Sequence, residues 1–185
     1  FDGGIENLAK QLDHASFNMI NCNYDLKNTV LHDKILPYKV FNKGGIKIGV
    51  YGLGIELDGL VPKELFGEVK YGDALEAARK YEQILKEEES CDFVICVSHL
   101  GYRYRGSKVS DVRIANGTSN TDLIIGGHTH SFLDAPEIYF NRRGNQVMIN
   151  QVGWAGLLLG QIDIAFEKNR KGKCISCKNQ WIESA

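Results

Sequence analysis

The chain reads DLIIGGHTH over residues 122–130, where an apolar run ends in two glycines and two histidines. Residues 93–101 read FVICVSHLG and repeat this organisation with a single histidine. Short apolar runs of this kind predict buried strands, and residues 108–116 between them predict a short helix. A strand, a helix and a strand in succession predict a right-handed crossover that brings the two strands close together in one sheet.

The pattern on either side of this crossover predicts two more helices and several more strands. Helical spacing of Ile5, Leu8, Ala9 and Leu12 predicts a first helix, and a second is expected from the capping residue Asp73 to about residue 89. Alternating or β-branched runs predict strands at 17–23, 36–41, 46–53, 136–140, 146–151, 157–166 and 174–182. Glycine and polar residues predict turns at 42–45 and 169–172. We therefore expect a single domain of mixed α/β layers with an all-β tail.

The composition is that of a globular domain. Of the 185 residues 43% are hydrophobic and 24% are charged, so the chain is able to bury a core. Its formal net charge of −1 comes without a basic cluster, which argues against a nucleic acid polymer or an anionic membrane as a partner. No apolar stretch approaches the roughly 20 residues of a membrane span.

The five cysteines are sparse for a chain of this length and do not predict a disulfide scaffold. Cys174 and Cys177 form one CxxC pair, which leaves two interpretations open. The pair is half of a structural zinc site, or it consists of ordinary strand cysteines, and we favour the second interpretation.

Three of the five histidines follow the two strands of the crossover. His99 follows the strand at 93–97, and His128 and His130 follow the strand at 123–125. Ligands gather at the carboxyl ends of strands in α/β sheets, so the three imidazoles are expected to converge, with His128 and His130 on the same side of an extended backbone. Imidazole ligands favour zinc, manganese, iron, cobalt or nickel.

The alternative for each of these histidines taken alone is a hydrogen-bonded loop residue. The other two, His14 and His32, lie in polar surroundings and are expected at the surface. Residues 102–105, which read YRYR, follow the first histidine loop. They contact phosphate or a base, or they form an exposed basic loop, which is the interpretation we favour.

An ordered set of motifs resembles the calcineurin-like metallophosphoesterases, specifically their 5'-nucleotidase branch. The motifs are FDGG at 1–4, LPY at 36–38, GIKIGVYGL at 45–53, SHLG at 98–101, DLIIGGHTH at 122–130 and QVG at 151–153. The resemblance covers nearly the whole chain and implies the carboxy-terminal half of the family's catalytic domain. It implies an α/β (α+β) fold that is part of a four-layer αββα sandwich, with mixed β-sheets flanked by helices.

The resemblance also implies a site with two divalent metal ions, zinc, manganese or iron, at which a metal-activated hydroxide attacks phosphorus. By similarity, His99 and His128 are ligands of one ion and His130 is a ligand of the other, where many relatives carry Gln. The family's remaining metal motifs and its catalytic His would precede Phe1. Residues 1–185 are therefore expected to be a single truncated domain without its own catalytic residue, and without a separate nucleotide-binding carboxy-terminal domain.

The function implied for the complete protein is hydrolysis of nucleotide phosphate monoesters, with a nucleotide or another phosphate ester as substrate. The alternatives are a 2',3'-cyclic phosphodiesterase, a nucleotide-sugar hydrolase and a thiosulfohydrolase, or else a catalytically silent fragment or a subunit that depends on a partner. The chain alone is expected to be inactive, and to self-associate or pair with a missing amino-terminal segment. The resemblance favours a bacterial protein in the periplasm or secreted.

Overall fold

The structure is a computed structural model that describes residues 1–167 and 172–182 of the chain. For residues 172–175 it describes the backbone alone. Its helical elements are α1 (Ile5–Leu12), α2 (Lys63–Phe66), α3 (Ala74–Gln83), the π-helix η1 (Ile84–Glu88) and α4 (Asp111–Gly117). Its longer strands are β4 (Tyr38–Lys43), β5 (Ile46–Leu53), β7 (Phe93–Ser98), β8 (Leu123–Ile125), β9 (Glu137–Phe140), β10 (Gln146–Asn150), β11 (Leu158–Phe166) and β12 (Gly172–Trp181). Two-residue strands are β1 (Met19–Ile20), β2 (Tyr24–Asp25), β3 (Ile35–Leu36) and β6 (Lys70–Tyr71).

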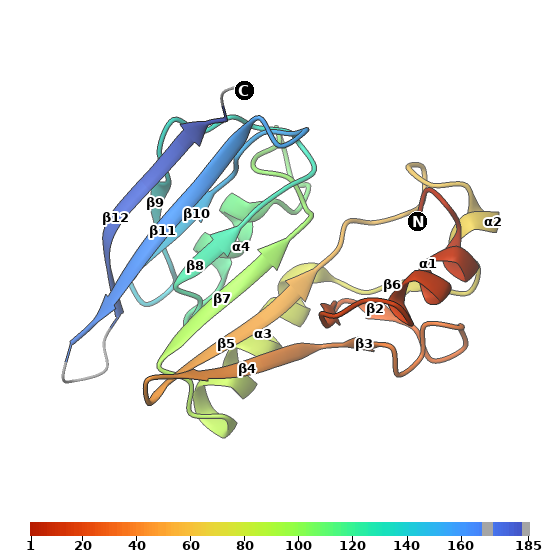
Figure 1. Cartoon of the computed structure of the whole chain (residues 1–185), viewed down its shortest axis with the longest axis horizontal. Helices are drawn as coiled ribbons and strands as arrows, with labels where there is room; N and C mark the ends of the chain where they lie inside the picture. The colour runs from red at the N-terminus through yellow and green to blue at the C-terminus, as the bar shows by residue number, and fades with distance from the viewer. Residues whose placement is uncertain (168–171, 183–185) are drawn as a thin grey trace.

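A six-stranded sheet with the order β4-β5-β7-β8-β10-β9 is the centre of the molecule. Its four inner strands are parallel, and the edge strands β4 and β9 are antiparallel to their neighbours. Helices α3 and α4 cover one face, while the β11–β12 hairpin lies across the other (Figure 1). The crossover from β7 through α4 to β8 places these two strands side by side, as the sequence predicts.

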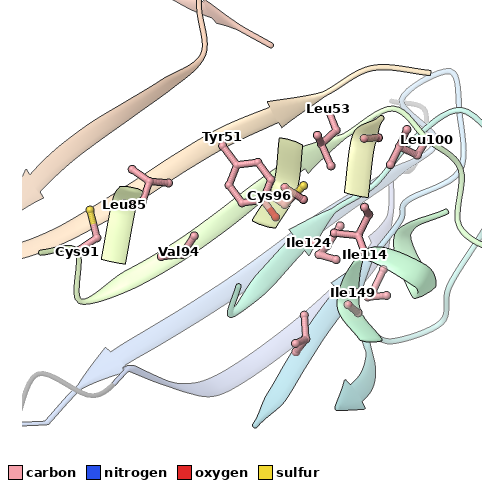
Figure 2. Close-up of a cluster of buried hydrophobic side chains, with 14 residues drawn as sticks. Tyr51, Leu53, Leu85, Cys91, Val94, Cys96, Leu100, Ile114, Ile124 and Ile149 are labelled. Atoms are coloured by element: carbon pink, nitrogen blue, oxygen red, sulfur yellow. The ribbon is translucent and has the colours of Figure 1, made fainter. Parts of the chain in front are cut away.

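The main core lies between the sheet and the helices, because alternate residues of each strand point to the same face. Val94 and Cys96 of β7 and Ile124 of β8 are fully buried there, together with Leu85 from η1 and Ile114 from α4 (Figure 2). A second cluster, around α1 and α2, consists of Ile5, Ala9, Leu31, Leu57, Phe66 and Val69. This smaller cluster forms the lobe that lies beside the amino-terminal end of the chain (Figure 1).

Most expected elements are present, with the bounds corrected in three places. The expected strand at 17–23 is reduced to β1, since Phe17 is exposed and Asn21 turns to accept hydrogen bonds from Asn23 and Tyr24. The helix expected from Asp73 to about residue 89 changes at Ile84 from α3 to the π-helix η1. The helix expected at 108–116 begins only at Asp111, where Ser110 caps it.

The tail is all-β as expected, although the turn at 169–172 lies largely outside the described residues. Cys177 lies in β12 and its sulfur is 3.5 Å from that of Met148. The side chain of Cys174 lies outside the described residues, so the preference for ordinary strand cysteines at this pair stays a prediction. Among the described residues, no helix combines the length and the apolar character that crossing a membrane requires.

Candidate metal centre

The two histidine loops leave the sheet at the same edge because their strands are parallel neighbours. Val97 of β7 pairs with Ile125 of β8, and each strand ends within one residue of that pair. The backbone amide of His99 donates to the carbonyl of Leu53 at 2.9 Å, and that of Gly126 donates to the carbonyl of Asn150 at 2.9 Å. The strands on either side therefore hold the first residue of each loop.

His99 and His128 come together at this edge. Their ring centroids are 5.2 Å apart and the ring planes are inclined by 68°. Gly127 allows this approach, because a Cβ atom there would lie 3.2 Å from Nδ1 of His99. Both rings line a cavity of about 580 Å³, which is also bounded by Phe1 and Asp2.

His130 does not join this pair in the way the sequence predicts. Its ring stacks on Trp154, with 5.9 Å between centroids and 17° between planes, and it does not line the cavity. Within the described residues, no group of three His, Cys, Asp or Glu side chains is placed to hold a metal ion. The structure thus brings His99 and His128 together, and the assignment of His130 to the same site stays a prediction.

Backbone conformation explains this difference. The expectation for His128 and His130 depends on an extended backbone, in which side chains two residues apart point the same way. Both residues instead adopt the left-handed backbone conformation, with φ of 71° at His128 and 52° at His130. Positive φ is uncommon outside glycine and costs on the order of 1–2 kcal/mol per residue, so the surroundings must hold this loop in its shape.

The surroundings of both paired imidazoles lower their pKa values and so favour the neutral form. Partial loss of solvent lowers the pKa of His99 below its usual value, and the nearby His130 lowers it further. The pKa of His128 is lowered in the same way, first by loss of solvent and then by His99. A neutral imidazole is the form that binds a metal ion, so these shifts favour ligation near neutral pH.

A buried polar network lies directly beneath the two loops. Asp111 is fully buried at the start of α4, and its carboxylate accepts hydrogen bonds from Oγ of Ser98 at 2.5 Å and Nε2 of Gln151 at 3.1 Å. Burial raises the pKa of Asp111 to about 7, while the hydrogen bonds from Ser98 and Gln151 act in the opposite direction. Gly126 packs against this carboxylate, because a Cβ atom there would lie 2.1 Å from Oδ2.

Comparison with known proteins gives the family. No family model matches the chain. The chain is 36% identical over 138 residues to a 5'-nucleotidase of Vibrio cholerae, which covers 70% of the chain and 24% of that protein. It is 31% identical over 134 residues to the trifunctional nucleotide phosphoesterase protein YfkN of Bacillus subtilis, which covers 72% of the chain and 8% of that protein. The crystal structure of a 5'-nucleotidase precursor from Thermus thermophilus superposes with a TM-score of 0.83 at 25% identity, covering 97% of the chain and 36% of that structure.

The chain belongs to the 5'-nucleotidase branch of the calcineurin-like phosphoesterases. It spans about a quarter of the length of the Vibrio protein, 24%, and a smaller part of the Bacillus protein. The 5'-nucleotidase family fold accounts for the mixed sheets flanked by helices in this chain.

The remaining candidate residues of this 5'-nucleotidase-family chain do not line the cavity of the paired histidines. His14 and His32 are exposed, as expected. In the loop at 102–105 the hydroxyl group of Tyr102 contacts that of Tyr139 at 2.8 Å, and that of Tyr104 donates to the carbonyl of Leu100. The two tyrosines thus fasten the loop to the protein, and both arginines are exposed as in the interpretation favoured from the sequence.

Sequence reasoning missed Asp111 and Gln151. A signal was present for Gln151, since it follows the apolar strand β10 in the same way that His99 and His128 follow β7 and β8. Asp111 gave no comparable signal, because an acidic residue in the first turn of a helix is common for reasons unrelated to a site.

Proposed function

We propose that the complete protein is a metal-dependent hydrolase of nucleotide phosphate monoesters, a 5'-nucleotidase, and that residues 1–185 contribute part of its active site. One observation carries this proposal. Two imidazoles, those of His99 and His128, face each other over one cavity at the carboxyl ends of neighbouring parallel strands, in a chain of the 5'-nucleotidase family. A cavity of about 580 Å³ is in the size range of small-molecule sites.

The residues present fit part of a metal site. Divalent metal ions are typical of calcineurin-like phosphoesterases. The donor pair His99 and His128 suits one first-row ion, with zinc, manganese or iron as candidates. We assign His130 to a second ion, and we expect the further ligands and the catalytic residue to come from outside residues 1–185. When bound, such ions supply Lewis-acid activation of the phosphate ester and of water.

The chain's own residues have a defined task in this scheme. His99 and His128 present neutral nitrogen donors at fixed positions, because the ends of β5 and β10 hold their loops. The nearby carboxylate of Asp2 borders the same cavity and raises the pKa of His99, although less than loss of solvent lowers it. A chain whose histidines form only part of a metal site also supports a second candidate, a subunit whose activity depends on a partner chain.

The test is phosphate release by the complete natural protein from adenosine monophosphate, with manganese or zinc supplied. We expect turnover of roughly 1 per second or more, loss of turnover with a chelator, and recovery when the metal is returned. A 2',3'-cyclic nucleotide, a nucleotide sugar and a thiosulfate adduct, assayed in parallel, distinguish the related activities. Adding or removing any second polypeptide that copurifies distinguishes the partner-dependent subunit. Turnover that is unchanged by the chelator on every substrate would contradict a metal-dependent hydrolase.

The same resemblance supports a periplasmic or secreted location. The Thermus relative is described as a precursor, which fits a protein exported from the cytoplasm. Protease accessibility of the protein in intact cells, compared with lysed cells, tests this placement.

A further inference from the structure

The side-chain hydrogen bonds of Gln151 and Asp111 do not go to His99 or His128 themselves but to the neighbours of all three site histidines. Both are buried, with 1% of Gln151 and none of Asp111 exposed. Nε2 of Gln151 donates to the carbonyl of Gly127, the residue before His128, at 2.9 Å. Oε1 of Gln151 accepts from the backbone amide of Ser131, the residue after His130, at 2.9 Å.

The same network reaches the other histidine loop by two routes. Asp111 accepts from the hydroxyl group of Ser98, the residue before His99, and from Gln151. Thr129, between His128 and His130, bonds to Oε1 of Gln151 at 3.2 Å through its hydroxyl group. That hydroxyl oxygen also accepts from the backbone amide of Tyr102 at 2.9 Å, which ties the second loop directly to the first.

We propose that Gln151 and Asp111 are positioning residues that hold the loop of His99 and the loop of His128 and His130 in the geometry that binds metal. The part of this inference that concerns metal binding rests on the proposed function. A side-chain amide suits this role, because it donates to one loop residue and accepts from another at the same time. The left-handed backbone at His128 and His130 requires such support, since strained conformations persist only where the surroundings fix them.

The first test measures amide hydrogen exchange without any metal in the complete natural protein. Gln151→Met keeps the volume of the side chain and removes its hydrogen bonds to Gly127, Thr129 and Ser131 of the second loop. We expect the amides of Ser131 and Tyr102 to exchange at least about 10-fold faster in this variant. The amide of Val94, which bonds to Asp122 at 2.8 Å in the sheet, reports any general loss of stability.

The second test measures Co²⁺ affinity by calorimetry. Loss of a group that orients metal ligands typically weakens binding about 10- to 100-fold, and we expect a change of this size for Gln151→Met. Glu82→Gln is the matched control. Glu82 is 2% exposed and accepts from the amides of Ser119, Asn120 and Thr121, so it is equally buried and bonded but has no contact with either histidine loop. The control is expected to keep the Co²⁺ affinity within about twofold of that of the unmodified protein.

Thr129→Val is the variant to use if Gln151→Met does not fold. It is close in shape, removes the hydroxyl link between the loops, and is expected to weaken Co²⁺ binding and to speed exchange at Tyr102. Unchanged exchange at Ser131 and Tyr102, or a loss of Co²⁺ affinity no larger than that of Glu82→Gln, would overturn the positioning role. If the unmodified protein binds no Co²⁺ and releases no phosphate, the proposed function fails, while the exchange measurement still decides whether the network holds the loops.

Discussion

The imidazole of His128 lies at the tip of a loop and contacts His99 across the cavity edge. Neither ring belongs to the buried clusters that stabilise the fold. A change at His128 is therefore expected to act on chemistry and much less on folding, which separates this residue from the fully buried groups beneath it.

We predict that His128→Ala in the complete protein lowers kcat for phosphate release by at least about 100-fold, because a metal-binding nitrogen is lost. The free energy of unfolding is expected to change by less than about 1 kcal/mol, as for other exposed or half-exposed positions. The measurements are steady-state kinetics and urea denaturation. His32→Ala, at an exposed histidine whose ring pairs with Asp33, serves as the control and should leave kcat unchanged. Near-normal turnover by the His128 variant would exclude this histidine from the site.

At this scale the sequence predicted part of the site. The meeting of His99 and His128 follows from two parallel strands that end at one edge, which is a property of topology. The orientation of His130 depends on single backbone angles, which a local pattern does not specify. Gln151 and Asp111 are 40 residues apart in the chain, and their contact exists only after the sheet and α4 have packed.

Aspartate side chains hold the amino-terminal ends of strands β7 and β8, opposite the ends from which the histidine loops leave. The carboxylate of Asp92 accepts from the backbone amide of Lys47 at 2.9 Å, and that of Asp122 accepts from the amide of Val94 at 2.8 Å. Burial raises the pKa of Asp122 to about 6, which the hydrogen bond from Val94 and the charge of Lys86 oppose. Each strand thus has a structural carboxylate at one end and a candidate metal-binding loop at the other.

We predict that Asp122→Asn becomes more stable relative to the unmodified protein as pH rises. The pKa is higher in the folded state than in the unfolded state, so the folded protein binds the proton more tightly. The stabilisation by this proton is complete below about pH 4 and is lost by about pH 6. Asn keeps the acceptor for Val94 and has no such proton to lose.

Urea denaturation at about pH 4.5 and about pH 7.5 measures this effect. The difference in the free energy of unfolding between the two proteins is expected to shift by about 2 kcal/mol in favour of Asp122→Asn. Asp58→Asn, at an exposed position, is the control and should show no shift of that size. Parallel pH profiles for Asp122→Asn and the unmodified protein would refute the prediction.

Elements with a strong periodic pattern were predictable, and short or irregular ones were not. Strands β5, β7 and β10 are long apolar runs whose burial follows from their composition. The strand expected at 17–23 failed because side-chain hydrogen bonds of Asn21 favour a turn there. The short elements α2, β2, β3 and β6 carry too few residues for a periodic signal.

At the scale of the whole molecule, the sheet exposes apolar side chains beside the candidate site. Val97 of β7 and Ile125 of β8, which pair in register, are 42% and 43% exposed. The sequence predicts that these strands are buried on both faces, so this face is less covered than expected. Since the relatives are several times longer than this chain, we expect other polypeptide to cover this face in the complete protein.

We predict that the isolated polypeptide 1–185 releases phosphate from adenosine monophosphate no faster than the assay blank, even with manganese or zinc present. Its histidines supply part of the proposed site, and the further ligands needed to hold two ions about 3.5 to 4 Å apart are expected from outside residues 1–185. The measurement is phosphate release, with intact mass used to exclude a copurifying fragment. Turnover of roughly 1 per second by the pure polypeptide would show that the site is complete without additional residues.

The same polypeptide is expected to self-associate, because contiguous exposed apolar surface favours burial against another chain. Sedimentation at increasing protein concentration measures this. The double change Val97→Thr and Ile125→Thr keeps β-branched side chains and reduces the apolar surface, so it should shift the equilibrium toward the monomer. A monomer at all concentrations for the unmodified polypeptide would show that this face needs no cover.

The position of Gln151 one residue beyond β10 makes the site sensitive to how the strands align. β10 pairs with β8 so that Asn150 lies opposite Ile125, and this register aims the next side chain at the loop of His128 and at Asp111. A slip by one residue would present an apolar Val152 or the shorter Asn150 instead, because side chains alternate between faces. The shape of the histidine loops therefore depends on the register of a strand that comes later in the chain, and a chain with β10 out of register would lose the hydrogen bonds that hold the loop of His128 and His130.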